Sequence, residues 1–356
     1  MTAPPIDAFG VVDAHVHFLP PGYAGSDDSE RFRPRARIEQ GRQIEVLLGG
    51  RAVDSVIGEM TRPEVLLGEL AQRGIRGAVL SPWVSTLPVG LDAAAAGALC
   101  RLQNQAMAEV VSSGRGGFAG LAALPTQAPE LCVELLREAM ASGLAGAEVP
   151  AISGGRGLGD PSLEPLWSAA QDLGAMVFVH PGSHGLSVDL LSGYYLWNAV
   201  GNPVETAASA AQLVMAGVFD RYPDLVALLA HGGGVLPALA SRIGRAWRKR
   251  REARLVTSTP PEESIRRFYF DSVLHDQALL ASLVGFAGAD HVLLGSDHPF
   301  DMGLDDPVGA VRVLGLEEDA EVAVLGGNAR RLAFRGTGGT FSGPSGSGSP
   351  SGSDPS

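Results

Sequence analysis

The stretch FGVVDAHVHF, residues 9–18, places two histidines at alternate positions of a short run that is otherwise mostly apolar and β-branched. A run of this kind predicts a buried strand. Because alternate residues of a strand point to the same face, we expect His15 and His17 to project side by side. Two imidazoles in that arrangement can bind one metal ion, or they can simply be polar residues at the end of a strand.

Further apolar runs follow along the chain, separated by helix-length segments with 3.6-residue apolar spacing. The predicted strands are 9–18, 74–82, 117–124, 143–150, 175–182, 224–233, 268–273 and 291–300, and the predicted helices include 63–73, 92–113, 129–142, 162–173, 203–220, 234–252 and 276–287. Eight apolar strands alternating with helices predict an α/β fold, a (β/α)₈ TIM-like barrel. A doubly wound sheet is the alternative, but HVHFLPPG follows the first strand where that fold usually carries a GxGxxG turn.

Three parts of the chain are distinguished by composition. Residues 1–335 are predicted to form the barrel domain. Within it, the polar segment 19–61 is too long for an ordinary strand-to-helix loop, and we interpret it as an insertion over the barrel mouth. Residues 336–356 are rich in Gly, Ser and Pro, which predicts a disordered tail.

Charge and cysteine content exclude several classes of protein. The chain carries 27 Lys and Arg against 39 Asp and Glu, a net charge of −12, which argues against a nucleic-acid partner. No export signal or membrane-spanning run is visible. Cys100 and Cys132 form no CxxC pair, so we expect a reducing, cytoplasmic environment.

Polar residues stand where several predicted strands end. His180 ends the fifth strand, His231 the sixth and Asp297 the eighth, so all three should meet His15 and His17 at the carboxyl end of the barrel. Three imidazoles and one carboxylate suit Zn²⁺, with Mn²⁺ or Fe²⁺ as alternatives.

One ion per subunit is expected at this site. A second ion would need a bridging anion, often a carbamylated lysine of the fourth strand, and the sole lysine, Lys249, lies in the run Arg248–Arg251 instead. Glu148 on the fourth predicted strand is the alternative bridge.

The spacing DxHxH, His, His, Asp over eight such units resembles the amidohydrolase superfamily. Within it, the chain resembles the aminocarboxymuconate-semialdehyde decarboxylase-like family over roughly residues 9–334. The motifs that carry the resemblance are AHVHFLP (14–20), VHPG (179–182), AHGGG (230–234), AWRKR (246–250), FDS (270–272), LLGSDHPF (293–300) and GNARRL (327–332).

The resemblance implies specific roles. His15, His17, His180 and Asp297 would be the metal ligands, and His231 the general acid and base, with Asp297 as a further proton carrier if the reaction is hydrolytic. Arg51 and Arg242 would bind the substrate carboxylate. Arg242 would do so in the neighbouring subunit's site, which implies a homodimer.

The chain departs from the family pattern at two places. Gly182-Ser183-His184-Gly185 replaces a tryptophan-containing stretch, and His298 stands where an aromatic residue is common. Both places belong to the substrate side in the family, so the substrate is left open. His184 and His298 could each contact substrate, or be ordinary polar residues near a turn.

Other residues have two interpretations each. Asp271 could orient a ligand histidine or could cap a helix or turn. Asp13 is an alternate residue of the same strand as His15 and His17, so its side chain should point to the same face. It could be a further hydrogen-bond acceptor for a ligand histidine. Trp83 could form an aromatic wall or belong to the core.

These observations predict a metal-dependent, non-oxidative decarboxylase of an unsaturated or aromatic carboxylic acid, an enzyme of aromatic compound metabolism. Hydrolysis of an ester, lactone or amide at the same site is the alternative. A third hypothesis is a metal-binding scaffold protein without activity. The presence of all five residues of the predicted metal centre argues against it. The sequence leaves open the substrate, the native metal and any oligomer beyond a dimer.

Overall fold

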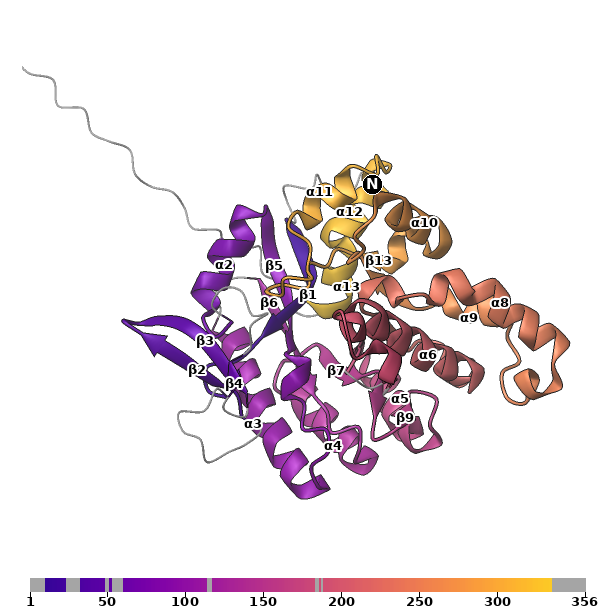
Figure 1. The fold of residues 1–356 in the computed structure, drawn as a ribbon, viewed down its shortest axis with the longest axis horizontal. Helices are drawn as coiled ribbons and strands as arrows, with labels where there is room; N and C mark the ends of the chain where they lie inside the picture. Colours follow the sequence, from indigo (N-terminus) through magenta and orange to yellow (C-terminus); the bar gives the residue numbers. More distant parts are fainter. Residues whose placement is uncertain are drawn as a thin grey trace, which may run out of the picture.

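The computed structural model describes residues 10–23, 33–48, 51–52, 60–113, 117–182, 186 and 188–334. Its centre is a sheet of eight parallel strands in the order β1-β5-β6-β7-β10-β11-β12-β13 (Figure 1). The strands are β1 (Val11–Phe18), β5 (Ile75–Pro82), β6 (Phe118–Ala123), β7 (Gly146–Pro150), β10 (Met176–His180), β11 (Val226–Leu229), β12 (Tyr269–Asp271) and β13 (Val292–Leu293). Each lies within one of the eight predicted runs, so the TIM-like barrel is confirmed.

The two edge strands of this sheet meet through the segment that follows β13. Ala14 donates its backbone N–H to Leu294 O at 2.8 Å, and His17 donates to His298 O at 2.8 Å. A parallel bridge joins Val16 and His298. The barrel is therefore closed by the loop after β13, because β13 itself is only two residues long.

Helices surround the strands (Figure 1). They are α2 (Pro63–Gln72), α3 (Ala93–Ser112), α4 (Pro129–Ala141), α5 (Glu164–Leu173), α6 (Asn202–Met215), α7 (Val218–Arg221), α8 (Leu236–Lys249), α9 (Pro261–Ile265), α10 (Gln277–Ala287), α11 (Pro307–Arg312), α12 (Glu318–Val322) and α13 (Asn328–Ala333). No helix among the described residues is long and apolar enough to cross a membrane.

The predicted helices are present, with one division and four additions. The segment 203–220 splits into α6 and α7 at Gly217, whose φ of +68° suits glycine. Four short helices, α9 and α11 to α13, were not among the predicted ones because five or six residues are too few for a periodic apolar pattern.

The region between β1 and α2 contains a small antiparallel sheet of β2 (Arg35–Glu39), β3 (Arg42–Leu48) and β4 (Arg51–Ala52). Gln43 Oε1 accepts a hydrogen bond from the Thr61 hydroxyl at 2.8 Å, which ties β3 to the chain just before α2. Residues 24–32, 49–50 and 53–59 lie outside the described residues, so coverage of the barrel mouth by this insertion stays a prediction. The predicted tail, 336–356, also lies outside them.

Side chains alternate between the barrel interior and the helices. On β10, Val177 and Val179 belong to the core under the helices, whereas Phe178 faces inward, with its ring 4.8 Å from that of His15. Glu148 on β7 is the register partner of Phe178 and is fully buried. Neighbouring residues in register share a face, so Glu148 also points into the barrel.

The Glu148 carboxyl has no hydrogen bond of normal geometry within the described structure. Burial raises its pKa to about 8, although the nearby His15 and the Ser81 hydroxyl oppose that shift. The group is therefore a neutral acid in the metal-free protein at neutral pH, which agrees with the cost of burying an unpaired charge.

This raised pKa gives a testable pH dependence. The unfolded chain loses the Glu148 proton near 4.5, whereas the folded protein keeps it until about pH 8, so this group makes stability fall as pH rises between those values. We expect the free energy of unfolding of chelator-treated Glu148→Gln to fall less over that interval, by at most about 1.4 kcal/mol per pH unit. Urea denaturation at several pH values measures the slope.

Glu138→Gln is the matched control, because Glu138 is an exposed residue of α4 paired with Arg101. Parallel pH slopes for wild type and Glu148→Gln would contradict the neutral-acid assignment.

Candidate metal centre

Four side chains converge at the carboxyl end of the barrel. His15 and His17 come from β1, His180 is the last residue of β10, and Asp297 lies four residues beyond β13. All four are buried, and each offers one ligand atom within 4.8 Å of the others. His15 Nε2 and His17 Nε2 are each 3.3 Å from Asp297 Oδ1 and 3.1 Å from each other. The predicted convergence is therefore found.

The hydrogen bonds of the three Nδ1 atoms determine the tautomers of these histidines. His15 Nδ1 lies 2.6 Å from Asp271 Oδ2, His17 Nδ1 lies 3.0 Å from Pro82 O, and His180 Nδ1 lies 3.0 Å from Pro181 O. Carbonyl and carboxylate oxygens only accept hydrogen bonds, so each Nδ1 must donate. In the neutral rings, the three Nε2 lone pairs then point into one small volume.

Lone pairs gathered in this way fit a divalent cation. His180 Nε2 and Asp297 Oδ1 are buried without a hydrogen-bond partner in the described structure. Orphaned buried polar atoms are costly unless something binds them. Three imidazoles and a carboxylate suit Zn²⁺, Mn²⁺ or Fe²⁺. The residues therefore fit a resident metal ion.

The charges of the cluster are strongly coupled. Burial lowers the pKa of His15, but Asp297 and Asp271 more than reverse that effect and raise the pKa to about 10. Burial lowers the pKa of His17, and burial together with the neighbouring rings lowers that of His180. Burial opposes ionisation of Asp297, yet His15 and the other rings hold its pKa well below 3.8.

Asp271 ties two parts of the site together. Besides binding His15, its carboxylate accepts the backbone N–H of His231 at 2.9 Å and of Gly232 at 2.8 Å. The contact with His15 is the one expected if Asp271 orients a ligand histidine, and that role stays a prediction. The two backbone contacts show that Asp271 also caps the turn. Asp13 is different, because its Oδ1 accepts the backbone N–H groups of His15 and Ser296 and no contact with a histidine ring is found within the described residues.

His231 stands beside the four ligands. It begins a left-handed turn two residues after β11, with a φ of +55°. Its Nε2 lies 3.4 Å from Asp297 Oδ2, and its Nδ1 has no hydrogen-bond partner in the described structure. The ring is in contact range of Asp297 but is not among the four grouped ligands.

Aromatic rings adjoin the cluster. The ring of Phe300 lies 5.0 Å from His17, and Trp83 lies 6.3 Å from Phe300. Trp83 is buried, which favours its core interpretation. Sequence reasoning did not single out Phe300, although its place three residues after Asp297 was a usable signal.

Of the remaining predicted residues, Arg242 and His298 have no side-chain contact with the four grouped ligands within the described part of the chain. The side chain of Arg51 and all of His184 lie outside the described residues. Arg242 is exposed on α8, and no ion pair or hydrogen bond of its side chain is found within the described part of the chain. His298 is buried and its Nε2 lies 3.1 Å from Glu69 Oε2 on α2, so this nitrogen is engaged by a helix.

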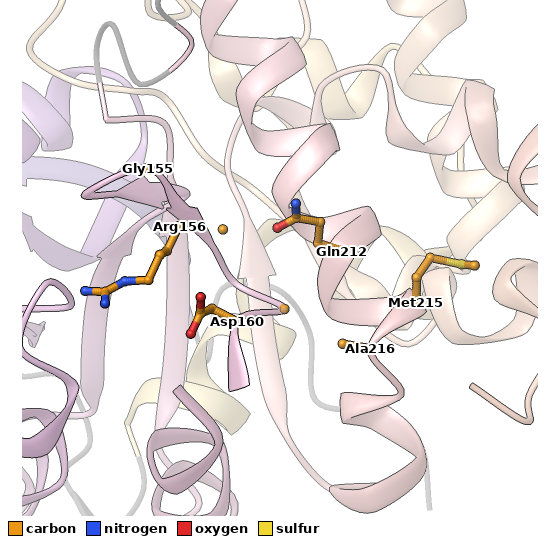
Figure 2. A pocket seen from close by; sticks show the side chains of 8 residues that line it. Gly155, Arg156, Asp160, Gln212, Met215 and Ala216 are labelled. Atoms are coloured by element: carbon orange, nitrogen blue, oxygen red, sulfur yellow. The ribbon is translucent and has the colours of Figure 1, made fainter. Parts of the chain in front are cut away.

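A separate hollow lies between α6 and the hairpin formed by β8 (Ile152–Ser153) and β9 (Arg156–Gly157) (Figure 2). It is lined by Gly155, Arg156, Gly157, Gly159, Asp160, Gln212, Met215 and Ala216. Arg156 donates to Gln127 O at 2.8 Å, and Asp160 accepts from Ser162. Because these charged groups are already engaged locally, the hollow lacks the convergent polar groups of an active site.

Comparison with known proteins places the chain in a family. Residues 12–334 match the amidohydrolase family. The chain is 31% identical over 327 residues to 2-amino-3-carboxymuconate-6-semialdehyde decarboxylase of Dictyostelium discoideum, covering 89% of this chain and 90% of that protein. It is 26% identical to 6-methylsalicylic acid decarboxylase of Penicillium expansum, covering 81% and 84%.

A similar solved structure is dihydroxybenzoic acid decarboxylase of Polaromonas, which holds manganese and the inhibitor 2-nitroresorcinol. Its TM-score is 0.71 at 23% identity, covering 92% of this chain and 97% of that one. The chain belongs to the amidohydrolase family, in the branch whose curated members include these decarboxylases.

The role of Asp271 can be tested without a substrate. Asp271→Asn replaces the acceptor of the His15 Nδ1 proton with a group that holds the ring less firmly. We expect Mn²⁺ to bind the chelator-treated variant 10- to 100-fold more weakly, as is typical when the partner of a ligand histidine is lost. Isothermal titration calorimetry measures this affinity.

Asp276→Asn is the control, since Asp276 is an exposed residue that caps α10 by accepting the Leu279 N–H. Equal Mn²⁺ affinities of Asp271→Asn and Asp276→Asn would rule out the orienting role.

Proposed function

We propose that this protein is a metal-dependent, non-oxidative decarboxylase acting on an aromatic or muconate-semialdehyde-like carboxylic acid. The observation that carries the proposal is the cluster of three Nε2 atoms and Asp297 Oδ1, with His231 beside it. Decarboxylation by the curated relatives supports the reaction class. His15, His17, His180 and Asp297 would hold one divalent ion per subunit.

In this reaction the bond between the carboxylate carbon and the rest of the substrate breaks, and CO₂ leaves. The carbon that loses CO₂ is protonated first, so the electron pair of the broken bond restores the conjugated system. One proton from solvent is consumed for each CO₂ released. A bound divalent ion supplies Lewis-acid stabilisation of the negative charge that develops next to the leaving carboxylate.

His231 is suited to deliver the proton. Imidazole accepts and releases protons near neutral pH, and the Nδ1 of His231 is not engaged by any described residue. The contact of its Nε2 with Asp297 Oδ2 holds the ring at the edge of the cluster. Phe300, beside His17, adds an apolar surface against which a flat conjugated substrate can pack.

Zn²⁺ is the metal we propose first, and Mn²⁺ and Fe²⁺ suit the same donors. The manganese in the Polaromonas relative supports the second choice. Metal analysis of the purified protein by mass spectrometry distinguishes the three.

We infer that the active unit is a homodimer in which Arg242 of each chain reaches the site of the other, while Arg51 binds substrate within its own chain. Exposure of Arg242 on α8 supports a role outside its own subunit. We expect sedimentation velocity to show a dimer and Arg242→Ala to raise KM about tenfold or more, because a bidentate carboxylate contact is lost. A monomer with full activity would contradict both statements.

The compartment proposed is the reducing cytoplasm, which is supported by the free, buried thiols of Cys100 and Cys132.

Product analysis tests the reaction class. We expect the metal-loaded protein to release CO₂ from one or more hydroxybenzoates or muconate semialdehydes, to lose that activity on chelation, and to regain it on addition of Zn²⁺ or Mn²⁺. Appearance of a new carboxylic acid from esters, lactones or amides, with no CO₂ from the acids, would establish hydrolysis instead.

The part played by His231 gives a further prediction. His231→Ala leaves the four grouped ligands intact, so Mn²⁺ affinity should stay within about threefold of wild type while kcat falls by 10²-fold or more, as expected for loss of a proton donor. Calorimetry and steady-state CO₂ release measure the two quantities. Substantial retained turnover would remove His231 from the reaction.

A further inference from the structure

Asp297 is held in a left-handed backbone conformation, with a φ of +62°. This conformation is uncommon for residues other than glycine and persists only where the surroundings enforce it. On one side, the backbone of Asp297 donates to His15 O at 2.9 Å. On the other side, Asp297 begins the loop 297–304, and its carbonyl oxygen accepts the Phe300 N–H at 3.1 Å.

Helix α2 makes contact with both ends of that loop. Glu69 Oε2 lies 3.1 Å from His298 Nε2 near the start of the loop, and Arg73 donates to Leu304 O at 3.5 Å at its end. Glu69 lies in the last turn of α2 and Arg73 is its C-cap residue, so both contacts come from the carboxyl end of this helix. Leu304 N–H also donates to Ser296 O at 2.8 Å, which brings the two ends of the loop together.

The pair between Glu69 and His298 is well shielded. The His298 side chain is only 8% exposed and that of Glu69 is 33% exposed. A carboxylate oxygen only accepts hydrogen bonds, so His298 Nε2, at 3.1 Å, is the donor to Glu69 Oε2. A hydrogen bond to an ionised acceptor in a shielded place is stronger than an exposed ion pair.

We propose that Glu69 and His298 are positioning residues that hold Asp297 in the geometry required to bind the metal ion. The chain of contacts runs from α2 through Glu69 to His298, and from the backbone of His298 to its neighbour Asp297. The backbone of His298 also accepts the His17 N–H, so the same residue fixes the spacing between Asp297 and a second ligand. This proposal rests on the metal site proposed above.

Mn²⁺ affinity of the chelator-treated full chain, measured by calorimetry, tests the proposal. We expect Glu69→Ala to weaken Mn²⁺ binding about tenfold, within the range found when residues behind metal ligands are removed. Glu69→Gln should restore most of the affinity, because its amide oxygen can still accept the His298 proton. His298→Gln tests the other partner, and the double variant Glu69→Ala/His298→Gln should bind no more weakly than the weaker single variant.

Glu64→Ala is the matched control. Glu64 lies on the same helix, is 49% exposed, and pairs with Arg62 rather than with the loop. We expect its Mn²⁺ affinity to equal that of wild type. Thermal unfolding of the metal-free proteins separates positioning from folding, since Glu69→Ala should melt within a few degrees of Glu64→Ala.

The outcomes distinguish the two levels of the proposal. A wild-type chain that binds no Mn²⁺ overturns the metal site itself. A wild-type chain that binds Mn²⁺ with the same affinity as Glu69→Ala and His298→Gln overturns the positioning role alone. That role is also overturned if Glu69→Gln fails to restore binding, or if the loss of affinity follows a loss of melting temperature.

Discussion

The site depends on the direction of three lone pairs. Each ligand histidine donates its Nδ1 proton to an oxygen that can only accept, and this leaves every Nε2 free to face the others. Without those contacts the rings could rotate or take the other tautomer. The Nε2 atoms of His15 and His17 would then not be held 3.1 Å apart. A divalent cation offsets the repulsion among donors and turns a costly arrangement into a stable one.

The barrel makes this arrangement rigid by placing each oxygen on a different element. Asp271 ends β12, Pro82 ends β5, and Pro181 follows β10 directly. Because parallel strands end at the same face, donors and their supporting acceptors are brought together by the fold rather than by nearness in sequence. Asp271 also accepts the backbone N–H of His231, so the position of the proposed proton donor is linked to the position of His15.

The carboxyl groups inside the barrel differ in their pKa values. The pKa values of Asp297 and Asp271 are lowered by their contacts with His15, whereas that of Glu148 is raised because burial outweighs the effect of the nearby His15. An additional buried anion would need a further cation. Our expectation of a single ion agrees with this, since Glu148 lies outside the group of four donors.

The amino-acid sequence was enough to predict the eight strand-forming runs, the shared face of His15 and His17, and the positions of His180, His231 and Asp297 at strand ends. Those features are local, because apolar runs and alternation depend only on neighbouring residues. Periodicity did not reveal the short helices α9 and α11 to α13 or the small sheet of β2 to β4.

Tertiary structure alone decided the contacts between residues far apart in the chain. The pairing of His15 with Asp271 spans 256 positions, and no pattern in either segment specifies the partner of the other. The same holds for His298, whose sequence position suggested a contact with substrate but whose Nε2 is engaged by Glu69 on α2. Local sequence restricts which residues can face a site, whereas the closed barrel decides which of them meet.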